Sequence, residues 1–451
     1  MDTVNLRDVH TLPPEQLDLQ NALHQERHLM QEVEVPIVTV SATFRKELAD
    51  KYRSLVHTAS DVVFSRAHYS MAEAVRQQAK LTKYTTHLTD PTNFVSYKDW
   101  SKVELTETAG QLTARYHLLK WLKDKIDTVV RSKLPVSEAI IEPLLYLTGK
   151  TEQPIICLHY EAGTILARAG KQVLQVVTDP QVRPQYLDCL LSKTDDSNLP
   201  VPKISYAVFD DRTKKELIKL AEELDKNIDD EAVVVTGSPV DPRITKLASL
   251  KREFIAEEPL RLVIATGGLG TNLDEIREIL DQFRPLLAPP EKIRLFLYGG
   301  THRDFRNFFE DFAATNNIRV GNLDDTGARI RILFEDSIID ANNNLIKYAF
   351  PWAQGFISKP SGDMAYDAAA AGCFLLFLKP WGVWEENVQR VFLRQGVGFD
   401  FKVNSSREHL IYLLNHGYLG RALTYAKKLP KIFSSGAANI ISNQQRLVKK
   451  K

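Results

Sequence analysis

The sequence predicts an α/β protein made of two Rossmann-like, doubly wound domains that face each other across a cleft, and two observations support this prediction. The chain has 451 residues, which is long for one ordinary hydrophobic core and suits two domains of roughly 200 residues each. Short β-branched runs alternate with helical patterns, and this alternation restarts near the middle of the chain. Such alternation indicates mostly parallel sheets covered on both faces.

The first half of the chain is expected to form one domain over residues 35–250. It follows a polar segment, 1–34, that we interpret as an N-terminal extension. The runs expected to form strands are VPIVTVSA (35–42), DVVFS (61–65), NFVSY (93–97), PIICLHY (154–160), QVLQVVTD (172–179), ISYAVFD (204–210) and AVVVTG (232–237).

The second half repeats the pattern and is expected to form a second domain over 255–430. Its expected strands are RLVIATGG (261–268), IRLFLYGG (293–300), IRILF (330–334), GFIS (355–358) and CFLLFL (373–378). The polar stretch 245–259 between the two halves is interpreted as the linker. Residues 431–451 are interpreted as a C-terminal helix, for which a return to the first domain is one option.

Charge and cysteine content exclude several classes of function. Lys and Arg number 58 against 57 Asp and Glu, so no global positive field gathers nucleic acid, and a nucleic-acid partner is not expected. The cysteines are scattered and lack the spacing of a disulfide framework or a zinc site; they are Cys157, Cys189 and Cys373. A reducing, cytoplasmic location fits best, and neither a metal nor a cofactor is expected.

The sequence also indicates no membrane span. No apolar run reaches the roughly 18 residues that a spanning helix needs, and the first 20 residues lack the pattern of a signal peptide. Contact with a membrane surface requires only a local patch, so a peripheral position on the inner face of a membrane stays open.

The segment ISKPSGDMAYDAAAAGCFLLFL (357–378) is a candidate phosphate site, because it is typical of a strand, a turn and a helix of small residues. Open backbone N–H groups of Ser361 and Gly362, the charge of Lys359 and the helix dipole would favour an anion. Asp367, one turn further on, would accept hydrogen bonds from ribose hydroxyls. The alternative is a plain strand–turn–helix whose alanines only pack on the sheet.

A glycine-rich loop, VIATGGLGTN (263–272), follows the first strand of the second half. In a doubly wound domain this position binds diphosphate, which makes four glycines candidate donor-binding residues; they are Gly267, Gly268, Gly270 and, after the next strand, Gly299. Glycine also closes tight turns for steric reasons alone. The full GxGxxG pattern and its acidic partner are missing, which disfavours a nicotinamide cofactor.

His68 lies in DVVFSRAHYSMAEAVRQQA (61–79), where an expected strand passes directly into an amphipathic helix. A histidine at a helix start that faces the cleft can act as a general base toward an acceptor hydroxyl. The alternative is a capping or surface histidine.

The C-terminal motifs resemble glycosyltransferases of the GT-B fold, in particular the family that includes monogalactosyldiacylglycerol synthase and peptidoglycan N-acetylglucosaminyltransferase. In that family's donor motif a turn with Lys or Arg leads to an acidic residue five positions before a glycine, as Asp367 precedes Gly372. WEENVQRVF (384–392) resembles the family's following polar cluster. By this resemblance three residues are placed to touch the sugar hydroxyls: Glu385, Glu386 and Asn387.

Motifs in the first half resemble the same family in the same order. They are His68 with its Ala-rich helix, CLHYEAG (157–163), LQVVTDP (174–180) and VVVTGSPVDPRI (233–244), so the resemblance covers roughly residues 60–430. Two departures stand out. Ser65, Arg66 and Ala67 replace the glycines that the family has before its histidine, and Asp363 would repel a diphosphate if it pointed inward.

The resemblance implies transfer of a hexosyl or N-acetylhexosaminyl group from a UDP-sugar to a lipid or another hydroxyl acceptor, without metal. His68 or Asp179 would take the acceptor proton, and His159 would support the site. Two other functions stay open, namely a UDP-sugar epimerase of the same fold and a degenerate nucleotide-sugar-binding protein without turnover. Asp179 is alternatively a cap or turn residue, and His159 a strand-end histidine satisfied by the neighbouring domain.

A lipid acceptor would fit the amphipathic segment QLTARYHLLKWLKDKIDTVV (111–130). Its cationic and aromatic residues could meet anionic headgroups; they are Lys120, Trp121, Lys123 and Lys125. The alternative is a helix that packs on its own domain.

Overall fold

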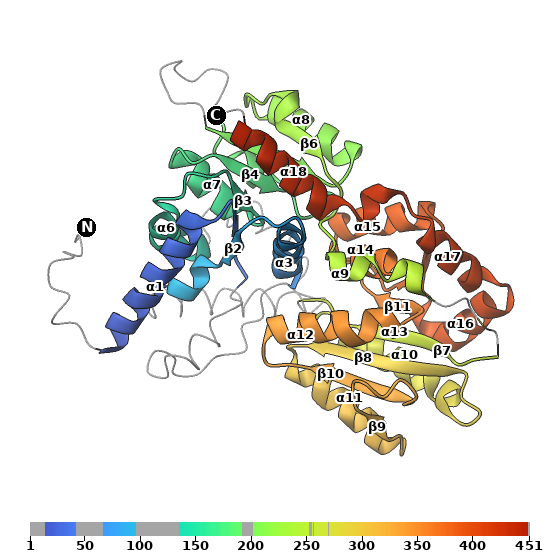
Figure 1. Cartoon of the computed structure of the whole chain (residues 1–451). Helices are drawn as coiled ribbons and strands as arrows, with labels where there is room; N and C mark the ends of the chain where they lie inside the picture. The colour runs from blue at the N-terminus through green and yellow to red at the C-terminus, as the bar shows by residue number, and fades with distance from the viewer. Residues whose placement is uncertain are drawn as a thin grey trace.

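The computed structural model of the chain describes residues 14–41, 66–95, 135–191, 202–251, 255, 257–268 and 270–449. Two parallel β-sheets with helices on their faces organise these residues (Figure 1). The expected strand 61–65 and the amphipathic segment 111–130 lie outside the described residues.

The first sheet has six parallel strands in the order β2-β1-β3-β4-β5-β6. The strands are β1 (Val35–Val38), β2 (Thr86–Thr89), β3 (Ile155–Cys157), β4 (Val173–Val176), β5 (Ile204–Val208) and β6 (Val233–Val235). The helices of this half are α1 (Pro14–Glu32), α3 (Arg66–Leu81), α6 (Pro135–Thr148), α7 (Tyr160–Arg168) and α8 (Asp211–Glu223). Apolar side chains of α6, α7 and α8 pack on one face, and those of α3 pack on the other.

The second sheet has seven strands in the order β13-β12-β11-β7-β8-β10-β9, with parallel pairing throughout. The strands are β7 (Leu260–Ala265), β8 (Ile293–Gly300), β9 (Val320–Gly321), β10 (Ile330–Phe334), β11 (Gly355–Ser358), β12 (Phe374–Phe377) and β13 (Gly398–Asp400). The helices are α10 (Leu273–Leu287), α11 (Arg303–Thr315), α12 (Ile338–Asn344), α13 (Phe350–Trp352), α14 (Met364–Ala370), α15 (Val383–Arg394), α16 (Ser406–Asn415) and α17 (Tyr418–Lys427). The predicted class, two doubly wound α/β domains, is confirmed.

One cluster of buried apolar residues joins the two halves. It contains residues of α3 and of the last helix together with residues of α12, α14 and α15. A second cluster, formed with α10, α11, α16 and α17, covers the other face of the second sheet. Because the first cluster runs through both halves, the hydrophobic effect favours their association as well as the folding of each one.

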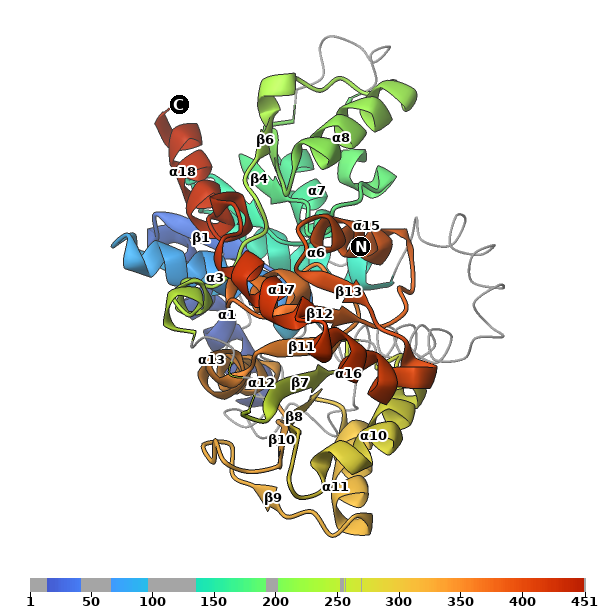
Figure 2. The same cartoon turned by 90° about the vertical axis from the view of Figure 1, so that its right-hand side faces the viewer.

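The last helix, α18 (Gly436–Lys449), packs on α3 of the first half, as both views of the chain show (Figures 1 and 2). Gln444 donates hydrogen bonds to the carbonyls of Glu34 and Pro154 at 3.0 and 3.1 Å. Between the sheets, the chain passes through α9 (Pro242–Thr245) and a short 3-10 helix, Ala248–Leu250, before β7 begins. The exact domain limits stay a prediction.

The expected strand at 93–97 is wrong in its described part, residues 93–95. Residues Pro91–Phe94 form a 3-10 helix, η1, because Pro91 fixes the first turn and the Asp90 side chain accepts a hydrogen bond from the Thr92 N–H. The neighbouring strand is instead β2, which was not among the expected strands.

Candidate functional site

The two halves meet where the loop after β4 touches the loop after β11. A Cβ atom at Gly362 would lie 3.0 Å from both Asp179 Oδ1 and the Thr178 carbonyl oxygen, so glycine permits this close approach. Asn387, at the start of α15, donates a hydrogen bond to the Pro180 carbonyl at 2.9 Å. The carboxyl ends of strands from both sheets therefore face each other, the position at which α/β sheets bind ligands.

His68 and His159 lie together on the first-domain side of this junction. Their rings are 5.0 Å apart between centroids and nearly perpendicular, at 89°. His159 caps α7, and its Nδ1 accepts a hydrogen bond from the Glu161 N–H at 3.3 Å. The neutral ring therefore carries its proton on Nε2. His68 hydrogen-bonds the backbone of Val40, which leaves its second ring nitrogen as a candidate proton acceptor.

Burial and the charge of Arg183 keep both imidazoles neutral. Burial is the larger cause, and together the two lower the pKa of His68 to about 4 against an opposing effect of Asp363. Burial also lowers the pKa of His159 well below its usual value, with contributions from His68 and Arg183. Burial raises the pKa of Asp179, although Arg183 opposes the rise. At neutral pH both imidazoles are therefore unprotonated, which is the form that a general base requires.

These values give a pH dependence of stability with a defined sign. The folded pKa of His68, about 4, lies below its ordinary value of 6.5, so the unfolded chain binds more protons between these limits. The free energy of unfolding should therefore fall as the pH falls from about 6.5 to 4, by about 2–3 kcal/mol for this group. Urea titrations at pH 7 and 4.5 should show a smaller loss for His68→Gln than for wild type. The control His28→Gln, whose side chain is 68% exposed, should lose as much as wild type; an equal loss in all three would contradict a neutral His68.

Arg183 is a functional candidate that the sequence analysis missed. It lies directly before the 3-10 helix η3 (Pro184–Leu187), and its Nη2 is 4.0 Å from Asp179 Oδ2. Its guanidinium carbon lies 5.6 Å from the centre of the Trp384 ring, which belongs to α15 of the second domain. The side chains of Arg183 and Asp179 remain 31% and 27% exposed. The only signal in the sequence was a cation four residues after the strand-end aspartate.

On the second-domain side, Lys359 is buried, with 7% of its surface exposed. Burial raises the pKa of Glu275 and of Glu385, and the charge of Lys359 opposes both shifts, which places the ammonium close to the two carboxyl groups. Glu385 also accepts a hydrogen bond from the Trp381 N–H at 2.6 Å. Glu386 is exposed on the outside of α15.

The turn after β11 differs from the sequence interpretation at Ser361. Its backbone N–H donates to the Lys359 carbonyl at 2.8 Å, so it is not open to a phosphate as expected. The Ser361 Oγ accepts a hydrogen bond from the Met364 N–H at 3.2 Å, which fixes the entry into α14. The donor-binding roles of Lys359, Ser361 and Gly362 stay predictions.

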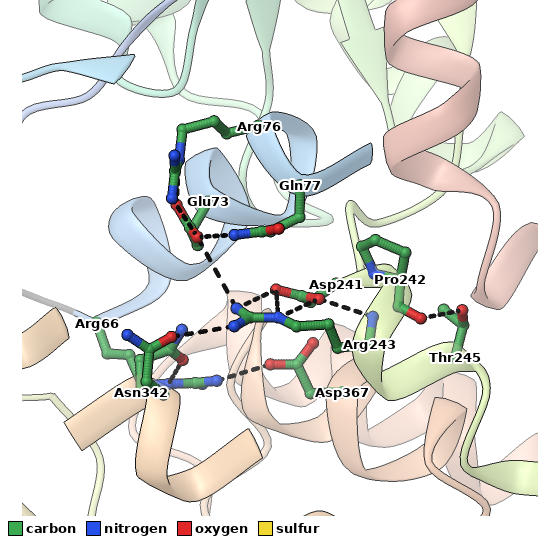
Figure 3. Close-up of polar contacts among 11 residues, drawn as sticks. Arg66, Glu73, Arg76, Gln77, Asp241, Pro242, Arg243, Thr245, Asn342 and Asp367 are labelled. Carbon is green, nitrogen blue, oxygen red and sulfur yellow. Dashed lines mark hydrogen bonds and ion pairs between the residues drawn. The ribbon is translucent and has the colours of Figure 1, made fainter. Parts of the chain in front are cut away.

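Asp367, which the sequence interpretation assigns to a ribose, binds an arginine side chain of the protein instead. The Arg66 guanidinium from α3 donates to Asp367 Oδ2 at 2.7 Å, to Asp363 Oδ2 at 2.6 Å and to Asn342 Oδ1 at 3.1 Å. Arg66 is 5% exposed, and Figure 3 shows it crossing from α3 to α12 and α14. Burial raises the pKa of Asp367 to about 7, while Arg66 opposes the rise. Ribose binding by Asp367 stays a prediction, and it requires this ion pair to open.

A second arginine, Arg243 of α9, strengthens the same junction (Figure 3). It binds Asp241 with two nearly parallel hydrogen bonds, of 3.0 Å from Nε to Oδ1 and 2.7 Å from Nη2 to Oδ2. It also donates to Asn343 Oδ1 at 3.1 Å and lies 3.8 Å from Glu73 Oε1 of α3. Together with Arg66, it fixes the two halves in one arrangement.

The space beside Gly267, the first glycine of the loop after β7, is open. Apart from its own two chain neighbours, no described residue has an atom within 4 Å of a Cβ built on Gly267. The loop is fixed by hydrogen bonds from Thr266 Oγ1 to Asn272 Oδ1, at 3.3 Å, and between His302 Nε2 and the Gly268 carbonyl, at 3.1 Å. Among the described residues, the buried Nδ2 of Asn272, the N-cap of α10, has no hydrogen-bond partner. A buried donor without a partner is rare in proteins and costs stability.

Of Gly270 and Gly299 in the expected donor site, Gly270 alone has a local reason to be glycine. Gly270 has a φ of 58°, a left-handed conformation that glycine adopts without strain. A Cβ at Gly299 would make ordinary contact, at 3.5 Å, with the Phe305 side chain. Their contact with a donor stays a prediction.

The described residues bear on metal binding and on membrane crossing. Among these, no group of three or more His, Cys, Asp and Glu side chains is arranged to hold a metal ion. In the same part of the chain, no helix is both long and apolar enough to cross a membrane.

Comparisons with known proteins establish the fold. No family model and no curated protein matches the sequence. The solved structures that match include the UDP-GlcNAc 2-epimerase from Neisseria meningitidis bound to UDP-GlcNAc, with 12% identity, 92% of this chain and 99% of that chain covered, and a TM-score of 0.52. MnaA from S. aureus in complex with UDP has 11% identity, 93% and 97% coverage, and a TM-score of 0.50. MurG from Acinetobacter baumannii has 12% identity, 92% and 99% coverage, and a TM-score of 0.46. The chain thus has the two-domain GT-B fold.

Proposed function

We propose that the chain is a glycosyltransferase that takes a hexosyl or N-acetylhexosaminyl group from a UDP-sugar to a hydroxyl acceptor, a lipid being one candidate. One observation supports the proposal most strongly. Proton-accepting imidazoles and a positively charged side chain are both found where the strand ends of the two domains face each other. The first domain supplies neutral imidazoles, His68 and His159, and the second supplies the buried cation Lys359. Group transfer from a diphosphate needs both a proton acceptor and positive charge for the leaving group.

The donor diphosphate is assigned to the loop after β7 and the turn after β11. Gly267 has no steric reason to be glycine among the described residues, and a ligand that approaches the backbone closely supplies one. The loop leads into α10, whose N-terminus favours an anion, and the unpartnered Asn272 Nδ2 can donate to one. UDP is the nucleotide of choice because of the family resemblance and because two structures of the same fold hold UDP or UDP-GlcNAc.

In the proposed reaction, the free ring nitrogen of His68 accepts the proton of the acceptor hydroxyl as its oxygen attacks the anomeric carbon. The bond from that carbon to the diphosphate breaks, and UDP leaves with the electron pair. Lys359 and the N–H groups at the start of α10 stabilise the developing negative charge. Asp179 is the alternative proton acceptor, since its side chain lies at the same junction.

A second candidate function is a nucleotide-sugar-binding protein without turnover. The ion pair between Arg66 and Asp367 favours it, because the carboxylate assigned to the ribose is already occupied by a protein cation. In such a protein, the nucleotide would bind through Lys359 and the loop after β7 alone.

One set of assays separates these functions. The purified protein is mixed with UDP-GlcNAc, UDP-Glc or UDP-Gal, with and without lipid acceptors, while free UDP and altered sugar are measured. UDP release that depends on an acceptor supports the transferase, and an altered sugar without acceptor identifies an epimerase. Binding of UDP without turnover identifies the second candidate. Absence of thermal stabilisation by UDP, GDP, ADP and TDP overturns nucleotide binding altogether.

Replacement of Gly267 by alanine tests the donor loop directly. Its φ is compatible with alanine and the added Cβ meets no described atom, so the free energy of unfolding should stay within about 0.5 kcal/mol of wild type or rise slightly. UDP affinity should fall about tenfold, because the methyl group blocks close approach of the phosphate. Gly327→Ala, in the connection between β9 and β10, is the matched control and should leave UDP binding unchanged. Equal UDP affinity of Gly267→Ala and wild type in calorimetric titration would place the diphosphate elsewhere.

A further inference from the structure

We propose that Arg183 binds a phosphate group of the substrate between the two domains; this inference rests on the proposed function and adds a residue to its site. Arg183 belongs to the first domain, whereas the cation so far assigned to the donor, Lys359, belongs to the second. A substrate with phosphate oxygens would therefore be held from both sides. This arrangement makes the first domain a direct participant in recognition of the charged group.

The position of Arg183 is fixed by its surroundings. Its backbone is extended and Pro184 follows it, so the residue lies at the start of η3, four residues beyond Asp179. The Trp384 ring from the second domain faces its guanidinium at 5.6 Å. A guanidinium can stack on an aromatic ring and still present its N–H edge to an anion. The side chain is 31% exposed, so that part of its surface is accessible to a ligand.

The charge of Arg183 is neutralised less completely than that of the other two arginines at the junction. Arg66 makes three hydrogen bonds of 2.6 to 3.1 Å to acceptors of the second domain, and Arg243 makes a paired contact with Asp241. The ion pair of Arg183 with Asp179 is long, 4.0 Å. At this separation the carboxyl neutralises the guanidinium only in part. Arg183 is thus the guanidinium best placed to accept a new anion.

The neighbouring histidines do not compete for that anion. Burial, with help from Arg183 itself, holds the pKa of His68 at about 4, so the ring is neutral near pH 7. Positive charge on the first-domain side therefore stays on Arg183, and proton acceptance stays with His68. A guanidinium does not release its proton at this pH. Phosphate binding by Arg183 and proton acceptance by His68 would therefore be carried out by separate groups.

The phosphate can come from two sources with the same chemistry. One is the diphosphate of the donor, and the other is a phosphate carried by the acceptor. Arginine binds either one through two parallel N–H···O contacts. Inorganic pyrophosphate and UDP represent the first source, and glycerol 3-phosphate represents the second.

The test compares Arg183→Ala and Arg183→Lys with wild type by calorimetric titration of these three anions. Arg168→Ala is the matched control, because Arg168 is a nearby exposed arginine whose Nη2 donates to the Asp188 carbonyl. We expect Arg183→Ala to weaken the binding of one kind of anion at least tenfold. A loss for pyrophosphate and UDP would indicate the diphosphate of the donor, and a loss for glycerol 3-phosphate would indicate a phosphate on the acceptor. Arg183→Lys should recover part of the loss, and Arg168→Ala should lose nothing.

A second readout follows the proton acceptor. Removal of the Arg183 charge should raise the pKa of His68, so the acid limb of the kcat/KM profile should move to higher pH in Arg183→Ala. Unchanged affinity for all three anions in a folded Arg183→Ala would overturn the inference while the proposed function stands, provided that Lys359→Ala loses UDP. A wild-type protein that binds none of the anions would overturn both.

Discussion

Replacement of Arg66 by alanine should lower the free energy of unfolding by about 3–5 kcal/mol, because it removes one partner of a buried charge cluster. The guanidinium is 5% exposed and lies between two carboxylates of the second domain, Asp363 and Asp367. Without it, those groups must protonate or attract water into the junction. Urea unfolding measures the loss. Arg212→Ala, which breaks the exposed Arg212–Glu216 pair of 2.7 Å, is the control and should cost less than about 1 kcal/mol.

The origin of this loss can be checked by removing the charge on both sides. The triple variant Arg66→Met, Asp363→Asn and Asp367→Asn has no buried charge at this point and should regain most of the stability lost in Arg66→Ala. If Arg66→Ala itself cost no more than the Arg212 control, the ion pair would not hold the domains together in solution.

Replacement of His68 by alanine should reduce kcat by about 10²–10⁴-fold, the range for loss of a positioned general base. The KM for the UDP-sugar should change little, because the donor is assigned to the second domain. His28→Ala, on the exposed side of α1, is the control and should keep full activity. Turnover is measured as acceptor-dependent UDP release in single-donor assays.

The result for His68 also discriminates among the candidate functions. Full turnover in His68→Ala together with a large loss in Asp179→Asn would move the proton-accepting role to Asp179. Tight UDP binding without turnover in wild type and in both variants would instead identify the non-catalytic binding protein.

The strands that the sequence predicted correctly are those with mostly apolar runs. Val173–Val176 and Leu260–Ala265 lie inside their parallel sheets, and burial on both faces selects such runs. The strand Thr86–Thr89 has leucine as its one strongly apolar residue, and Val320–Gly321 is two residues long, so neither has a readable period. At 93–95, the turn chemistry of Asp90 and the following proline outweighed the apolar residues Phe94 and Val95.

The location of the site was predictable because it follows from topology. Parallel strands end at a common edge, and by this rule the loop that contains Asp179 meets the turn at Gly362. The partner of Asp367 was not predictable, since Arg66 is 301 positions away in the sequence and only the packing of α3 against α14 brings the two together. The sequence showed that Arg66 replaces a glycine of the resembling family, but it did not show that this arginine pairs with Asp367.

A crystal structure of the protein with UDP tests the central claim most directly. We expect the diphosphate to lie within hydrogen-bonding distance of the backbone at Gly267 and of Lys359 Nζ, between the ends of β7 and β11. A diphosphate bound away from both residues, or crystals soaked in millimolar UDP that contain no nucleotide, would contradict the account.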